Sequence, residues 1–228
     1  VNNLTVKHLT NGIFILLLGF FCILLGNITI SYIGLDTNKG FLRIKQWVFR
    51  RHSTTISSIW ITAFFIHVFT SMFAIIAGFT QFLKTFIHKK IHRIMGYTYL
   101  ISVLVFSATS GFIMGLVANG GIPSIIAFTL LSVLWWIFTY LAFTSAKNKK
   151  FEQHGKWMIR SYALALSAIT LRLYKWMYAN WIDPDMELLH PMELYRIVAW
   201  AGWVPNLLIA ELLIFRKSHL KLLKPTSK

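Results

Sequence analysis

Two residues that can carry a charge stand inside long apolar stretches of this chain. At 1.5 Å per helical residue, His67 lies about 15 Å and Arg172 about 10 Å inside the outer ends of the helices that these stretches predict. Charged or ionisable groups at such depth are costly and are candidates for function. We predict an outer cavity that accepts an anionic headgroup, a quinone carbonyl or a carboxylate. Alternatively, the acids of the following loop neutralise Arg172; they are Asp183, Asp185, Glu187 and Glu193.

A second pair of residues has the spacing of haem ligands. His92 and His154 stand near the starts of two other predicted helices, at one depth, as a b-type haem with two histidine ligands requires. Gly96, one turn after His92, would leave room for a porphyrin edge, and Arg160 could neutralise a propionate. The simpler alternative is that both histidines are solvated at the membrane surface.

The remaining polar side chains inside apolar stretches are few. Glu211 is the one acid there, and an ion pair with Arg160 or Arg93 would keep it charged. We assign Gln81, Asn206 and Glu211, with His67 and Arg172, to a ligand pocket.

The composition indicates the elements that position these residues. The chain has 228 residues, of which 56% are hydrophobic and only 13% charged, although the net charge is +16. A soluble domain carries about 25% charged residues, so this composition favours a membrane protein. Six apolar runs are long enough to span a bilayer as helices. They cover about 13–33, 57–83, 94–117, 124–146, 158–179 and 194–215.

These runs predict an all-α, polytopic helical bundle that forms a single membrane domain over residues 1–228. Lys and Arg concentrate in the segments that share a side with the N-terminus, so both termini are predicted to be cytoplasmic. Residues 41–50 interleave aromatic and basic side chains, which is typical of a helix lying in the membrane interface. The tryptophans, among them Trp60, Trp135 and Trp203, lie mostly near predicted helix ends and are expected to anchor the bundle at the membrane surfaces.

Several function classes are excluded by the sequence. There is no Gly-rich phosphate loop, nucleophile elbow or zinc-protease motif. One cysteine, Cys22, excludes an internal disulfide. The basic charge has no water-soluble face on which to bind nucleic acid, so the lipid bilayer is the expected partner.

Two segments resemble an uncharacterised bacterial family of multi-spanning membrane proteins, known only as a domain of unknown function. One is HRIMGYTY at 92–99, and the other is HGKWMIRSYAL at 154–164. The resemblance extends over about 57–216 and implies location in the bacterial cell membrane, but no established activity. The family is similar in outline to cytochrome b561-like proteins, which bind haem on a four-helix core; this chain lacks their two matched pairs of histidines within the membrane.

Three functions remain open at this point. The first is electron transfer through a haem b at His92 and His154, linked to the quinone pool. The second is binding or transport of a small anionic or amphiphilic ligand at His67 and Arg172. The third is a structural subunit, either of a membrane complex or of a homo-oligomer. A membrane enzyme that uses His67 as an acid or base is also open.

Overall fold

The structure is a computed structural model that describes residues 29–38, 40–50, 52–83, 90–185 and 187–216, with isolated positions before residue 29. Its described part is helical and contains no strand. The helices are α2 (Gly40–Phe49), α3 (Thr54–Thr80), α4 (Lys90–Ile101), η1 (Ser102–Ser107), α5 (Ala108–Leu116), α6 (Ile122–Lys147), α7 (Phe151–Ala165), α8 (Ser167–Met177), η2 (Tyr178–Ile182), α9 (Pro191–Ala201) and α10 (Val204–Phe215).

Local sequence explains where the long helices begin and end. The Ser53 side chain accepts a hydrogen bond from the Ile56 backbone N–H and so caps α3. Gly120 and Gly121 adopt φ values of +87° and +73°, which let the chain turn sharply between α5 and α6. Pro191 opens α9, where its missing N–H costs no hydrogen bond.

Four helical segments are long and apolar enough to cross a membrane: 54–80, 90–116, 122–147 and 191–215. They correspond to four of the six predicted runs. The predicted run 158–179 is not one continuous helix, because α7 ends at Ala165 and α8 begins at Ser167. The run 13–33 lies mostly outside the described residues. Over the described residues the protein is therefore all-helical, with four candidate membrane spans.

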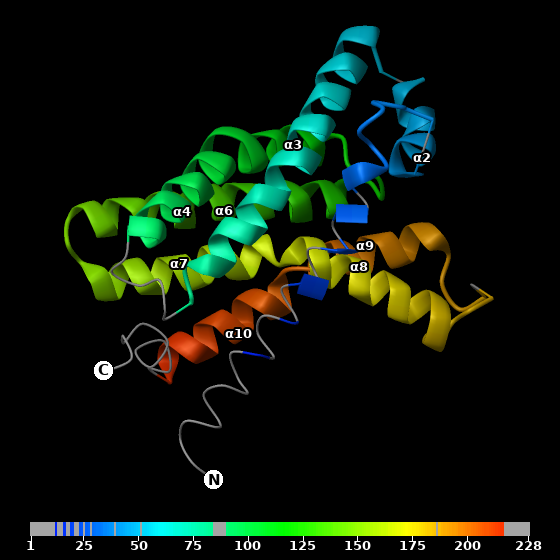
Figure 1. Ribbon diagram of the computed structural model, residues 1–228. Helices are drawn as coiled ribbons and strands as arrows, with labels where there is room; N and C mark the ends of the chain where they lie inside the picture. The colour runs from blue at the N-terminus through cyan, green and yellow to red at the C-terminus, as the bar shows by residue number, and fades with distance from the viewer. Residues whose placement is uncertain are drawn as a thin grey trace.

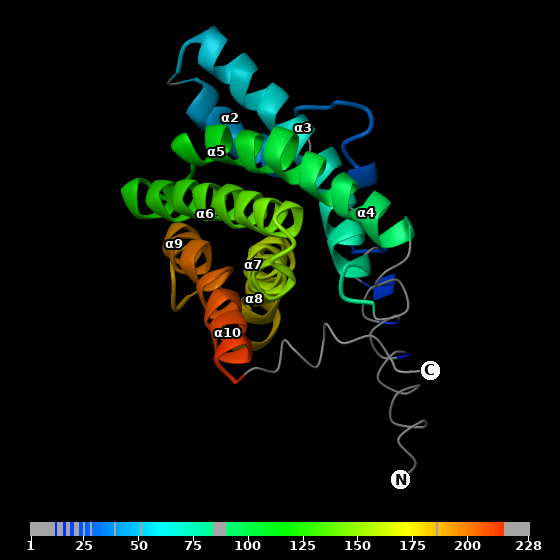
Figure 2. The same ribbon diagram turned by 90° about the vertical axis from the view of Figure 1, so that its left-hand side faces the viewer.

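Figure 1 shows that α6 and α7 run side by side and that α3 crosses them obliquely. In Figure 2, α6 lies between the α3–α5 group and the α7–α10 group. The core follows this arrangement, because its main cluster draws on α3, α4, α6 and α7 around the buried Tyr99 and Tyr162 rings. Gly78 makes their approach possible, since a Cβ there would lie 2.6 Å from the Tyr162 ring.

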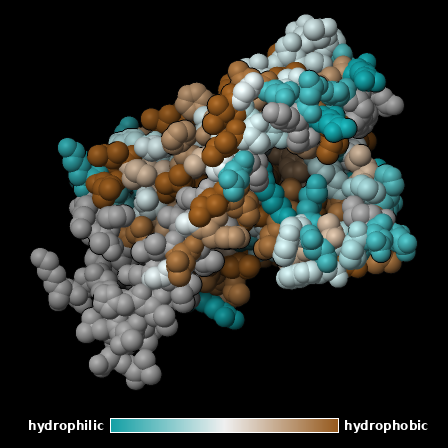
Figure 3. Space-filling model, turned by 45° about the vertical axis from the view of Figure 1, so that its right-hand side comes forward, coloured by the Kyte–Doolittle hydropathy of each residue, from teal (hydrophilic) through white to brown (hydrophobic). Residues whose placement is uncertain are grey.

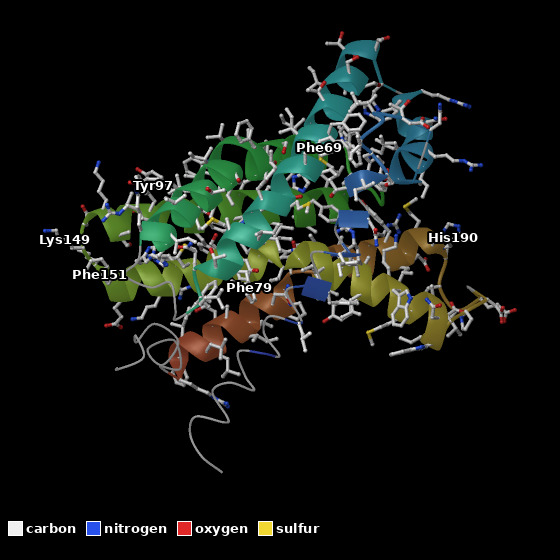
Figure 4. All side chains as sticks on the ribbon, in the orientation of Figure 1. Phe69, Phe79, Tyr97, Lys149, Phe151 and His190 are labelled. Carbon is white, nitrogen blue, oxygen red and sulfur yellow. The ribbon has the colours of Figure 1, made fainter. Side chains whose placement is uncertain are left out.

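The bundle has two distinct ends. Lys149 and Phe151 mark one end and His190 marks the other (Figure 4), and we call them the Lys149 end and the His190 end. Hydrophilic side chains gather toward the His190 end, while hydrophobic ones cover much of the flank (Figure 3). This distribution is the one expected of a bundle that crosses a bilayer.

Residues 40–49 form a helix where one was predicted at 41–50, and its basic residues differ in exposure: Arg43 is exposed, but Lys45 is not. Lys45 and Leu42 are fully buried. The Lys45 Nζ donates to the Val117 carbonyl oxygen and to Asn119 Oδ1, the latter at 3.0 Å, and lies 4.9 Å from the centre of a Trp60 ring. The negative end of the α5 dipole attracts this cation. Lys45 therefore fastens α2 to the bundle.

Burial lowers the pKa of Lys45 from 10.5 to about 8. Between these values the folded protein has released a proton that the unfolded chain still holds, so its free energy of unfolding should rise from pH 8 to 10.5. Lys45→Met should remove this contribution. Denaturation of both proteins in nanodiscs across that pH range measures the difference, and parallel curves would contradict it.

Three tryptophans are not membrane anchors, contrary to the prediction. Trp60, Trp135 and Trp203 are each at least 90% buried. The indole N–H of Trp60 donates to the Met114 carbonyl, and that of Trp135 donates to the Tyr99 hydroxyl. Trp60 and Trp203 do lie near helix ends and Trp135 lies in the middle of α6, but all three side chains point into the bundle.

Candidate functional site

A cavity of about 60 Å³ lies between α3 and α8. The side chains of His67 and Arg172 both line it, as their similar predicted depth suggested. The other lining residues are Thr29, Val68, Ser71, Met72 and Ala168. None of these described residues is an acid. We call this space the His67–Arg172 cavity.

The His67 ring is held in one orientation by α5 and η1. Its Nδ1 lies 2.8 Å from the Ser107 carbonyl oxygen. A carbonyl only accepts, so Nδ1 carries the proton and the neutral ring keeps Nε2 as an acceptor. Gly111 gives the ring its space, because a Cβ there would lie 3.2 Å from His67 Cε1.

The carbonyl that binds His67 belongs to an irregular turn. Ser107 ends the π-helical segment η1, in which the Ala108 N–H bonds to Val103 five residues back. Such single turns within α-helices often mark functional sites. The Ser107 hydroxyl also bonds Thr70 Oγ1 at 2.8 Å. The irregular turn thus places both polar groups of Ser107 against α3.

Arg172 lines the cavity from the middle of α8. Its Nη1 donates to the Ala168 carbonyl at 2.5 Å, one turn back. Asp183 does not neutralise it: the Asp183 carboxylate accepts instead from the Tyr178 hydroxyl at 2.6 Å and from the Glu187 N–H at 2.8 Å. Arg196 likewise donates to the Gly120 carbonyl at 2.8 Å. The positive charge of Arg172 therefore meets the cavity with no described acid lining it.

The interruption between α7 and α8 contributes to the cavity. Ala168 lies in the first turn of α8 and lines the cavity. The N-terminal end of a helix carries a partial positive charge and favours an anion. The dipole of α8 and the charge of Arg172 therefore act in the same direction.

Asn206 lies elsewhere than predicted, since it is not among the residues that line the cavity. Its Nδ2 donates to Thr170 Oγ1 at 2.8 Å and to the Ala163 carbonyl at 3.2 Å. In a continuous helix the Ala163 carbonyl would accept from the backbone N–H of Ser167. Asn206 thus satisfies a carbonyl near the point where α7 stops.

The predicted partner of Glu211 is Arg160. Arg160 Nε and Nη2 donate to the two carboxylate oxygens at 2.5 and 2.8 Å, and the guanidinium lies 4.6 Å from the centre of a Trp157 ring. This fork geometry is the strongest form of an ion pair. Glu211 and Arg160 are thus occupied with one another and do not join the His67–Arg172 cavity.

The structure places His92 and His154 at one level. His92 lies seven residues before Tyr99, and His154 lies seven residues before Ser161. Because the Tyr99 and Ser161 hydroxyl oxygens are only 2.6 Å apart, the two histidines lie about two helical turns from the same point. The His154 Nδ1 lies 2.8 Å from the Ala142 carbonyl oxygen, which leaves Nε2 as the possible metal ligand.

Gly96, however, does not leave the space predicted for a porphyrin edge. A Cβ at Gly96 would lie 3.2 Å from Gln81 Oε1, and Gln81 is itself buried. The Gln81 Nε2 donates to the His92 carbonyl oxygen at 3.3 Å. Gln81 therefore fills the face of α4 beside Gly96, and it lies there rather than in a pocket with His67.

A buried polar network was not found from the sequence. The Ser161 hydroxyl bonds both Tyr99 and Thr139, at 2.6 and 2.7 Å, and the Trp135 N–H donates to the Tyr99 hydroxyl at 3.2 Å. Serine and threonine are common in membrane helices, so their types alone give no signal. The network joins α4, α6 and α7.

Comparison with known proteins gives one family and no closer relative. Residues 64–214 match the family model described as predicted membrane protein (DUF2306). That range includes His67 and Arg172. No curated protein and no solved structure matches the chain significantly.

Proposed function

Since the chain belongs to the DUF2306 family of predicted membrane proteins, we propose that it is a bacterial cell-membrane protein that binds a small amphiphilic anion. The proposed topology has six spans and cytoplasmic termini: the apolar run 13–33 and the α7–α8 pair join the four candidate spans. This topology puts the Lys149 end in the cytoplasm. The His67–Arg172 cavity then lies within the membrane.

The observation that carries this function is the Arg172 charge at a cavity lined by no described acid. An unbalanced cation in a low-dielectric setting is costly, and an anionic ligand offsets that cost. The guanidinium donates to oxygens of a carboxylate, sulfonate or phosphate. The His67 Nε2 accepts from a hydroxyl on the same headgroup.

The volume of the cavity limits which part of the ligand can fit inside it. A water molecule needs about 10–15 Å³ by this measure, so 60 Å³ accommodates a headgroup and no more. Val68 and Met72 supply apolar walls beside the polar groups. The ligand is therefore a compact acidic head on an apolar tail, and the tail lies outside the cavity.

A series of ligands that share an octyl tail and differ in the charge of the headgroup tests this function. Octanesulfonate and octanoate should raise the thermal unfolding temperature of the protein in nanodiscs, because both present anionic oxygens to Arg172. Octanol and octyltrimethylammonium, with neutral and cationic heads, should not. A short-chain quinone in the same series tests binding through a carbonyl. Equal shifts for all four octyl compounds would show that only the tail is bound and would contradict the proposal.

The Gly111 contact gives a prediction about His67. Gly111→Ala places a Cβ 3.2 Å from His67 Cε1 and 3.0 Å from Ser132 Oγ, so the ring must shift and the affinity for 2-hydroxyoctanoate, whose hydroxyl donates to His67 Nε2, should fall. Gly115→Ala is the matched control, because its Cβ would meet the Thr129 backbone at 3.0 Å, away from His67. It should lower the unfolding temperature with affinity unchanged. If both variants bind like the wild type, His67 is not part of the site.

A second candidate is haem binding, favoured by the common level of His92 and His154. These two residues would hold the iron through Nε2, and the group would supply one-electron chemistry. Gln81 would have to leave the face of Gly96 to admit the ring. The visible spectrum of protein purified from haem-replete cells tests this: a Soret band abolished in His92→Ala/His154→Ala supports haem, and a colourless protein contradicts it.

A further inference from the structure

Two helices of the bundle are interrupted next to one another. One break lies between α7 and α8 at Leu166, and the other lies between α9 and α10 at Gly202 and Trp203. The second break follows from Pro205, which has no N–H to donate to Ala201. Asn206 links the two breaks, because its Nδ2 contacts the Gly202 carbonyl at 3.3 Å as well as Ala163 and Thr170.

The breaks divide this part of the bundle into two units. Toward the Lys149 end, α7 and α10 are joined by the Arg160–Glu211 ion pair and by the packing of Ile159 and Ala163 on Ala210. Toward the His190 end, α8, η2 and α9 are joined by the packing of Leu171, Tyr178, Leu194 and Val198. The α7–α10 unit and the α8–α9 unit are visible in Figure 1 as two helix pairs that meet near the middle of the molecule.

The joint between the units consists of the two breaks, at Leu166 and at Gly202 and Trp203. Within the α8–α9 unit, α9 packs closely on α8 at Gly202, where a Cβ would lie 3.0 Å from Leu171 Cβ. Leu171 is the neighbour of Arg172 in the chain, so a rotation of this unit at the joint moves Arg172.

His67 stays behind in that rotation. It lies within the continuous helix α3 and is bonded to Ser107 at the end of η1. The cavity wall thus consists of a fixed side with His67 and a side with Arg172 that belongs to the α8–α9 unit. Rotation of that unit changes the distance between the two residues and the direction from which the cavity is reached.

We infer that the protein is a carrier, in which rotation of the α8–α9 unit about the two helix breaks exposes the bound anion to alternate sides of the membrane. This inference rests on the proposed anion binding. Secondary transporters commonly place their substrate sites near the bilayer midplane, beside interrupted helices whose N-terminal ends face the substrate. The start of α8 at the cavity has this arrangement.

Distance measurements between spin labels test the movement. In a Cys22→Ser background, labels at Leu173 on α8 and Phe73 on α3, both well exposed, report on the joint. Octanesulfonate should shift the distribution of this distance. The matched control, Leu173 with Ile197 on α9, lies within one unit and should not change. A change in the control pair would overturn the two-unit division.

Transport itself is measured as efflux of octanesulfonate from liposomes, because its permanent charge prevents unaided crossing. The wild type should release it. Pro205→Ala restores the backbone N–H that the second break lacks, and should keep binding but lose efflux. If octanesulfonate binds the wild type but produces neither a distance shift nor efflux, the carrier inference is wrong while the binding proposal stands. If it does not bind the wild type, the binding proposal itself is wrong, and the carrier inference that rests on it falls as well.

Discussion

Replacing Arg172 with leucine is expected to weaken octanesulfonate binding roughly 10- to 100-fold. A hydrogen bond to a charged group contributes about 1.5–3 kcal/mol, and about 1.4 kcal/mol corresponds to a factor of ten in affinity. The measurement is isothermal titration of octanesulfonate into nanodisc-embedded protein. Arg172→Lys keeps the charge but loses the planar fork, so it should retain part of the affinity.

Stability separates a binding role of Arg172 from a structural one. Because no described acid lines the cavity, Arg172→Leu removes an unbalanced cation and should leave the unfolding temperature unchanged or raise it. Arg196→Leu is the matched control, since Arg196 is exposed and bonds Gly120 away from the cavity. Its affinity should equal that of the wild type. Loss of stability in Arg172→Leu with normal affinity would contradict the account.

Replacing Glu211 with leucine is expected to lower the free energy of unfolding by about 2–4 kcal/mol, because it leaves the Arg160 charge without its partner in the helix bundle. The expected loss is less than that of a fully buried pair, since 45% of the Glu211 side chain is exposed. Chemical denaturation in mixed micelles measures it. The double variant Arg160→Met/Glu211→Leu removes both charges and should recover much of the loss. Equal instability of the single and double variants would show that packing, and not charge, holds α7 to α10.

Part of this arrangement could be predicted from the sequence, because counting residues along a predicted helix gives the depth of each side chain in the membrane. Counting residues put His67 and Arg172 at similar levels, and the structure has them in one cavity. The same reasoning selected Arg160 as a partner of Glu211, because few charges are available in the apolar runs. In both cases the choice of partner is small, because few ionisable side chains lie within the apolar runs.

Side-chain contacts between helices could not be predicted in this way, because they depend on how each helix is rotated about its own axis and how it packs on its neighbours. Gln81 was assigned to the ligand pocket and Gly96 was expected to leave room for a porphyrin edge, yet the two residues lie side by side and Gln81 fills that space. Trp60 was placed near a helix end, but its face points inward. No proline or glycine stands at Leu166 to predict the break there. The hydrogen bond that compensates for it comes from Asn206, which is distant in sequence.

The central claim is that the His67–Arg172 cavity holds the acidic head of an amphiphile. An alkyl sulfonate with a diazirine next to its head tests this most directly, when it is photolysed on the protein in nanodiscs and the adducts are mapped by mass spectrometry. Adducts should fall on Val68, Met72 and Ala168, and excess octanesulfonate should suppress them. Adducts spread over lipid-facing residues, unchanged by the competitor, would contradict the claim.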